Sequence, residues 1–125
     1  MTVNEAGEHF DLIFPNAFPY EIKLNMLSHL DKRVFDDVLS KYADKPVEEF
    51  NGYKPGVSDH QELLIAFPND DIYISYLAAQ TDMINGDIAR YNNSAGVFNA
   101  AFSEFCRMYT RTHRYAVNNK LGDLV

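Results

Sequence analysis

A long heptad pattern in the C-terminal half of the sequence constrains the fold more than any other feature. Mainly apolar residues recur there at alternating steps of three and four, as they do on the buried stripe of a helix. We call this series the seam, and it comprises Ile88, Tyr91, Ala95, Phe98, Phe102, Phe105, Tyr109 and Thr112. A helix of roughly 25 residues would be about 40 Å long, which is more than one small domain needs to cover its core.

The polar segment YNNSAGVFNAAF, residues 91–102, lies across this seam. Asn, Ser and Gly weaken a helix interior, but the seam continues on both sides of residues 92–94. We therefore expect the helix to continue, with these polar side chains pointing away from the seam. The resulting flank is uncharged from residue 92 to residue 103, whereas an exposed helix usually carries Glu and Lys.

This uncharged flank has two interpretations. It is either simply solvated, or it is a contact surface for another chain, because the cores of protein interfaces are depleted of charge. Under the second interpretation, the candidate subunit interface consists of Asn92, Asn93, Ser94, Gly96, Asn99 and Ser103.

The size and composition fit one helical domain. The chain has 125 residues, 46% of them hydrophobic, which is enough for one core. It has no apolar run of membrane-spanning length, and its acidic, polar start lacks the features of a signal peptide. Its single cysteine, Cys106, cannot form an internal disulfide. These features predict a protein of the reducing cytoplasm, with no contact with a membrane.

The first third of the chain predicts two helices. Thr2 and Glu5 have the spacing of a capping box, which indicates a first helix that ends at about Ile13. Pro15 and Pro19 break it, and Pro19 suits the first position of a second helix of about six turns. We expect the acids and lysines of this second helix on its solvent side. Its apolar positions are Ile22, Met26, Leu27, Leu30, Val34, Val38, Leu39 and Tyr42.

Residues 43–69 show no helical period and contain three prolines. Asn51-Gly52, flanked by Phe50 and Tyr53, is a strong hairpin signal, and the ELLIAF segment resembles a short strand. We therefore expect a small β-hairpin at the edge of a mainly α bundle. The predicted organisation is one helical domain, residues 1–113, with a loop insertion at about 45–69, followed by a C-terminal tail, residues 114–125.

A third helix is expected to begin at Asn69, a good N-cap residue, and to turn Tyr73, Leu77 and Ile84 inward. Gly86 and Asp87 have the character of a helix end and a new N-cap. However, the apolar phase continues through them. We therefore favour one long helix over residues 70–112, kinked near Gly86, over two separate helices.

The charge is strongly acidic and uneven. The net charge of −7 argues against broad nucleic-acid binding. Residues 106–125 nevertheless hold four basic residues and one acid. The basic residues Arg107, Arg111 and Arg114 either stabilise the end of the helix through its dipole or dock on an acidic partner.

We find no pattern that predicts catalysis. Asp59, His60 and Glu62 are the only metal-ligand types that lie together, and the capping-box spacing of Ser58 and Gln61 explains that string better. None of the four histidines has HxxxH or HExxH spacing. Cys106 is best explained as a structural residue, although Arg107 beside it favours a thiolate. We therefore expect a protein that is not an enzyme and needs no metal or cofactor.

Residues 62–113 resemble a group of small proteins encoded in the structural-gene modules of tailed phages and prophages of Gram-positive bacteria. The matching strings are ELL at 62–64, NGDIARYNNS at 85–94, FN at 98–99 and YTRTH at 109–113, with Asp71 and Tyr73 as a D-x-Y pair. FNGY at 50–53 and, more loosely, LSHLD at 27–31 extend the resemblance over most of residues 20–113.

The resemblance implies a non-enzymatic virion protein of the head–tail connector class, also called adaptor or head-completion proteins. Such subunits form a homo-oligomeric ring between the portal and the tail. The expected partners are thus copies of the chain itself, the portal and tail or neck proteins. The expected locations are the bacterial host cytoplasm during assembly and then the neck of the virion. The alternative is a small helical adaptor or regulator that binds a single phage or host protein.

Overall fold

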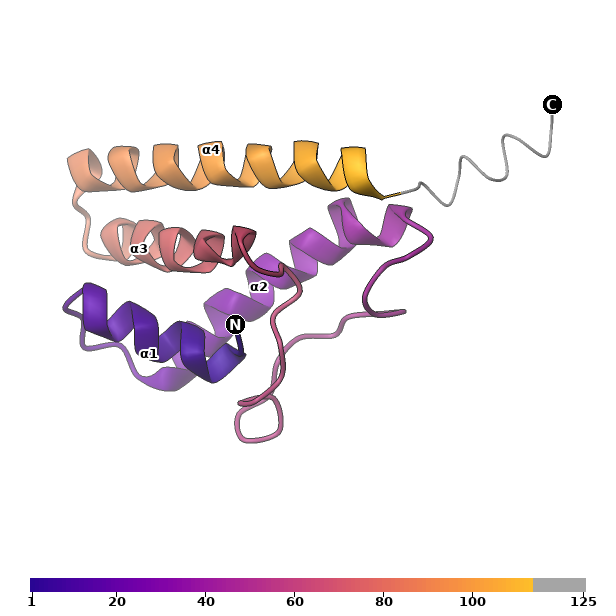
Figure 1. Cartoon of the computed structure of the whole chain (residues 1–125). Coiled ribbons are helices and arrows are strands. Elements are labelled where there is room, and N and C mark those ends of the chain that lie inside the picture. The colour runs from indigo at the N-terminus through magenta and orange to yellow at the C-terminus, as the bar shows by residue number, and fades with distance from the viewer. Residues whose placement is uncertain (114–125) are drawn as a thin grey trace, which may run out of the picture.

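A computed structural model describes residues 1–113, and within this range four α-helices enclose one hydrophobic core (Figure 1). The helices are α1 (Val3–Ile13), α2 (Tyr20–Asp37), α3 (Ile72–Ile84) and α4 (Ile88–Thr112), with two short 3-10 helices, η1 (Leu39–Lys41) and η2 (Asn69–Asp71). α3 packs against α1, α2 and α4, and Figure 1 shows α4 lying along α3 at the edge of the bundle. The mainly α fold expected from the sequence is confirmed.

α1 begins with the predicted capping box. The Thr2 hydroxyl accepts a hydrogen bond from the Glu5 backbone N–H, and the Glu5 carboxylate accepts one from the Thr2 N–H. Two further N–H groups of the first turn donate to the backbone carbonyls of Gln61 and Asp59, at 3.0 and 2.9 Å. All four bonds satisfy donors that a helix N-terminus leaves free, so the long loop helps to hold α1 in place.

α2 differs from the prediction in two ways. It is shorter than expected, and it buries two charged residues that were expected to face solvent. It ends at Asp37, and Pro19 is its N-cap rather than its first helical residue. The expectation that its acids and lysines face solvent is wrong for Lys23 and Asp31, which are buried. The Lys23 stem packs inside, and its ammonium reaches Asp11 of α1 at 2.5 Å, as long amphipathic side chains often do.

The predicted hairpin does not form, and residues 51–54 contain no β-strand. Gly52 has a φ of +100°, a conformation that glycine adopts readily. Phe50 and Tyr53 on either side of it turn into the core, with ring centroids 4.9 Å apart. The Tyr53 N–H donates to the Ser28 hydroxyl of α2 at 2.8 Å. Anchoring to α2 thus replaces strand pairing in this segment.

The ELLIAF segment is not a strand either. Its Glu62 instead forms an isolated antiparallel bridge with Thr2. This bridge is completed by the Leu63 N–H, which donates to the Met1 carbonyl at 3.0 Å. The segment therefore pairs with the start of α1 instead of with its own loop.

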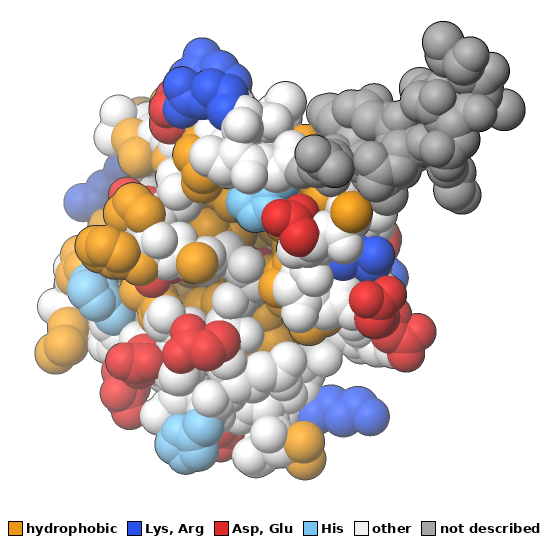
Figure 2. All heavy atoms as spheres, turned by 45° about the vertical axis from the view of Figure 1, so that its right-hand side comes forward, with side chains coloured by type: hydrophobic (Ala, Val, Ile, Leu, Met, Phe, Trp, Pro, Cys, Tyr) orange, Lys and Arg blue, Asp and Glu red, His pale blue; other side chains and the backbone are white. Residues whose placement is uncertain are grey.

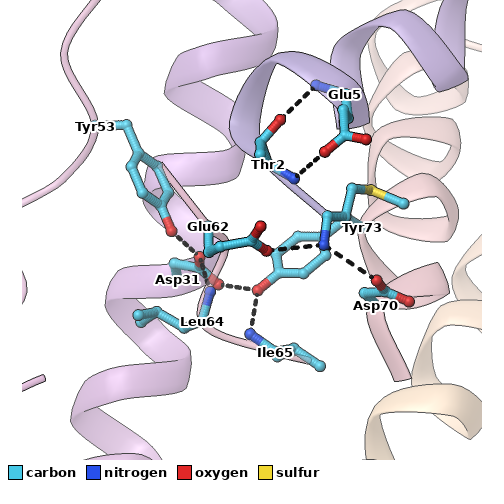
Figure 3. Close-up of polar contacts among 10 residues, drawn as sticks. Thr2, Glu5, Asp31, Tyr53, Glu62, Leu64, Ile65, Asp70 and Tyr73 are labelled. Carbon is cyan, nitrogen blue, oxygen red and sulfur yellow. Dashed lines mark hydrogen bonds and ion pairs between the residues drawn. The ribbon is translucent and has the colours of Figure 1, made fainter. Parts of the chain in front are cut away.

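A buried carboxylate fastens the loop to the helices (Figure 3). Asp31 of α2 is completely buried and accepts hydrogen bonds from the Tyr53 hydroxyl, from the Tyr73 hydroxyl at 2.7 Å and from the Leu64 N–H at 3.1 Å. The Tyr73 hydroxyl in turn accepts from the Ile65 N–H at 2.8 Å. Burial raises the pKa of Asp31 to about 6, and the three hydrogen bonds limit that rise. The network joins α2, α3 and the loop at one point.

α3 and α4 are separate helices, so the expectation of one kinked helix is wrong. Gly86 has a φ of +72°, the left-handed conformation that commonly ends a helix. Asp87 then caps α4, its carboxylate accepting from the Arg90 N–H at 3.1 Å. The reversal at Gly86 folds α4 back along α3. It also leaves Ile84, which was expected to face inward, 55% exposed.

The start of α3 also differs from the prediction. Asn69 does not cap this helix, because η2 intervenes and α3 begins only after Asp71. The inward positions Tyr73 and Leu77 are confirmed, since both side chains are completely buried.

The seam faces the bundle only along part of α4. Phe105 and Tyr109 are buried, and the Tyr109 ring meets Tyr42 edge-on at 4.8 Å. Four seam residues nearer the N-terminus are half-buried: Tyr91, Ala95, Phe98 and Phe102. Both ends of the seam lie outside the core, because Ile88 is 74% exposed and Thr112 is exposed. The 13 residues of α3 are too few to cover the 25 residues of α4.

Candidate assembly surface

The outer face of α4 is open, and it carries no charged residue from Asn92 to Ser103. Of the six residues predicted to form a subunit interface, five are exposed: Asn92, Asn93, Gly96, Asn99 and Ser103. Val97, which lies between Gly96 and Asn99 in the sequence, is 54% exposed. Only two of the 25 residues of α4 are buried. This surface therefore presents amide, small and apolar groups to its surroundings without a formal charge.

Ser94 is the exception among the predicted interface residues. Its side chain is half-buried, and its hydroxyl donates to the Asp82 carboxylate of α3 at 2.5 Å. Ser94 thus fastens α4 to α3, and the expectation that it lies on the outer face is wrong. Its position is 300° around the helix from Tyr91, which brings it back toward α3.

A groove runs beside this face, between α2 and α4, and has a volume of about 930 Å³. The floor comes from α3, and the Asn51–Gly52–Tyr53 segment closes one side. The lining residues from the helices are Asn25, Ser28, His29, Lys32, Arg33, Tyr76, Ala79, Gln80, Met83, Tyr91, Ala95, Phe98 and Asn99.

The groove is basic, although the chain as a whole is acidic. Lys32, Arg33 and His29 line it, and no carboxylate does. Lys32 is partly neutralised, since its ammonium lies 3.2 Å from Asp36 and also donates to the Phe50 carbonyl. Arg33 has no ion pair with any of the residues 1–113. The groove thus offers at least one uncompensated cation to a ligand.

The groove also combines aromatic rings with free amides. Tyr76 and Phe98 pack with centroids 5.3 Å apart. Burial raises the pKa of the Tyr76 hydroxyl, and the positive charge of Arg33 opposes this rise. Arg33 and Tyr76 therefore interact electrostatically in the groove. The side chains of Asn25, Gln80 and Asn99 form no hydrogen bond with another residue in the described range. Tyrosine and arginine are typical of the strongest contacts in protein interfaces.

Sequence reasoning missed this groove because three helices and a loop contribute to it. One signal was available on α2, where Asn25, His29, Lys32 and Arg33 follow each other at helical spacing. Such a series places one polar and basic stripe on a single face. Its meaning depends on the neighbouring helices, which the sequence does not position.

The predicted basic end lies at the other end of α4. Arg107 and Arg111 are exposed and line a shallow hollow with Cys106 and Thr110. The Arg107 guanidinium is 2.5 Å from Glu104, so only part of its charge is available. Arg114, the third predicted docking residue, lies outside the described residues. Figure 2 shows this end of the molecule, where Asp and Glu side chains form several patches around exposed apolar surface.

The residues considered for chemistry do not form a site. Asp59 accepts a hydrogen bond from the Tyr20 hydroxyl at 2.5 Å, whereas Glu62 faces solvent beside the start of α1. No group of three metal-binding side chains occurs within residues 1–113. Burial raises the pKa of Cys106, which favours the unreactive thiol over the thiolate.

Ser58 does not form the predicted capping box with Gln61. Its hydroxyl accepts from the Lys54 N–H at 2.9 Å, and its own N–H donates to the Lys54 carbonyl at 2.9 Å. Toward Ser58, Gln61 contributes its backbone N–H, which donates to the Ser58 carbonyl at 2.9 Å. The string is a turn in the long loop, because no helix follows it.

No protein-family model, curated protein or solved structure matches this chain. Among the helices of the described region, none is both long and apolar enough to cross a membrane.

Proposed function

We propose that this chain is a structural subunit of a phage or prophage virion, of the head–tail connector class, which assembles side by side into a ring between portal and tail. The observation that carries the proposal is the open surface of α4, which is uncharged from Tyr91 to Ser103 and continues into the groove. The resemblance of residues 62–113 to proteins of phage structural modules supports the same class.

The α4 surface has the properties that a subunit contact requires. A helix of 25 residues gives a rigid edge, and an uncharged edge loses less hydration energy than a charged one when a neighbour covers it. The exposed amides of Asn92, Asn93 and Asn99 supply hydrogen bonds across such a contact. Small residues such as Gly96 allow a close approach.

The charge of the chain also suits this role. A net charge of −7 keeps the protein from binding DNA that passes through a ring. The exposed Arg107 and Arg111 at the end of α4 are available for an acidic surface of the portal or a tail protein.

Analytical ultracentrifugation of the full chain, alone and with the cognate portal, tests the proposal. Asn93→Lys should leave the helical circular-dichroism spectrum unchanged and should weaken assembly, because it places a charge at the contact. Gln61→Lys is the matched control, since it adds the same charge at an exposed position of the loop. Unchanged assembly of Asn93→Lys, or unfolding of this variant, would count against the proposed surface.

An adaptor that binds one phage or host protein is the second candidate, and the basic, aromatic groove favours it. A monomeric chain that recovers a single soluble partner in a pull-down, and no virion protein, would support this candidate over the connector.

A further inference from the structure

α1 carries an exposed stripe whose polar contacts, among residues 1–113, are confined to the first turn of α1 and its cap. Glu5, Glu8 and Leu12 follow each other at steps of three and four, so they lie on one side of the helix. Leu12 is 87% exposed, which is unusual for a large apolar side chain in a helix that packs on a core. The contacts of the two carboxylates are local: Glu5 bonds Thr2, and Glu8 accepts from Asn4 at 3.2 Å.

The groove between α2 and α4 is complementary to this α1 stripe. It offers Arg33 and His29 to carboxylates, and the rings of Tyr76, Tyr91 and Phe98 to an apolar side chain. Its free amides have hydrogen-bonding capacity left for a further chain. A helix that anchors itself in a groove through positions i, i+3 and i+7 is a recurrent mode of recognition.

The two surfaces cannot meet within one molecule. No residue of α1 lines the groove, and α1 is fixed to α2 and α3 through Val3, Ala6 and Phe10, which are buried. Joining the α1 stripe to the groove therefore requires two copies of the chain. Such a contact joins two different faces. This heterologous geometry closes into a ring when the rotation between neighbouring copies divides a full turn.

We infer that the α1 stripe of one copy docks into the groove between α2 and α4 of the next copy. This inference rests on the proposed function and names the second half of the subunit contact. In this contact, Glu5 and Glu8 of one copy lie against Arg33 and His29 of the next. Leu12 of the first copy is covered by the aromatic rings of the groove. Since Asn99 lines the rim of the groove, the incoming helix also reaches the outer face of α4.

A charge exchange tests this contact in the full-length chain. Arg33→Glu and Glu8→Arg each create like charges across the contact, so each variant alone should self-associate at least about tenfold more weakly than the wild type. An equimolar mixture restores complementary charges at every contact, because the two variants then alternate. Sedimentation velocity should therefore show recovery of assembly in the mixture only.

An apolar variant tests the same contact without charge. Leu12→Ser removes the anchor and should also weaken self-association about tenfold or more, as expected from the loss of a buried leucine. The matched control is Val57→Ser, since Val57 is similarly exposed on the loop. Lys54→Glu and Glu48→Arg control for the charge changes. All variants should keep the helical circular-dichroism spectrum of the wild type.

The outcomes separate this inference from the proposed function. If Asn93→Lys weakens assembly but Arg33→Glu and Leu12→Ser do not, the docking of α1 is refuted and the connector proposal stands. If the single variants weaken assembly and the mixture fails to recover it, the groove binds something other than the α1 stripe, and the inference is again refuted. If the wild type does not self-associate up to its solubility limit, with or without a portal, both are refuted.

Discussion

Replacing Asp31 by Asn should flatten the dependence of folding stability on pH between 3.8 and about 6. Burial raises the pKa of Asp31 from its ordinary value of 3.8 to about 6 in the native state. The native state therefore binds this proton more tightly than the unfolded chain does, and protonation stabilises the fold. This contribution is complete below pH 3.8 and disappears as the pH rises to about 6.

The size of the effect follows from the difference between the two pKa values. A difference of about 2 pH units, at about 1.4 kcal/mol each, corresponds to about 3 kcal/mol. The free energy of unfolding of the wild type should fall by about this amount, relative to Asp31→Asn, across the window. Glu5 and Asp11, whose pKa values are lowered by hydrogen bonds from Thr2 and Lys23, titrate alike in both proteins and cancel.

Urea unfolding, followed by circular dichroism at a series of pH values, measures this difference. Asp37→Asn is the matched control, since the Asp37 side chain is exposed and forms no hydrogen bond or ion pair with the rest of residues 1–113. Its stability curve should run parallel to that of the wild type. Parallel curves for the wild type and Asp31→Asn would refute the assignment of Asp31 as a buried, titrating carboxylate.

Substitutions at three further positions test the fold and the surface of α4. Phe105→Ala should lower the free energy of unfolding in urea by about 3–5 kcal/mol, because Phe105 is one of two buried residues of α4. Gly86→Ala should cost about 1 kcal/mol in the same assay because of its positive φ. Gly86→Asn should cost less, and an equal loss would contradict the left-handed helix end. Asn99→Lys should leave the thermal melt unchanged but reduce self-association in sedimentation, and a lowered melting temperature would show that this face is not free.

The features predicted correctly from the sequence are those with a local cause. The capping box of Thr2 and Glu5 lies within one helical turn, so its spacing is sufficient to identify it. Gly86 and Asp87 carried equally local signals for a helix end and a new cap. The prediction gave more weight to the apolar residues that continue at helical spacing through Gly86. That spacing alone does not distinguish a kinked helix from a reversal of the chain.

The features that were missed depend on residues far apart in the sequence. The loop does not form a hairpin at Asn51-Gly52, because Tyr53 bonds Ser28 and Asp31, 25 and 22 residues away. Burial of Asp31 was not predictable from α2 alone, since its donors come from the loop and α3. The groove was missed for the same reason, because its basic stripe, aromatic rings and amides come from separate helices.

Electron microscopy of the full chain, mixed with its cognate portal, tests the central claim most directly. We expect closed rings of this chain on the portal, with neighbouring subunits in contact along α4. Particles of bare portal beside a free monomer, under conditions in which both proteins are folded, would contradict it.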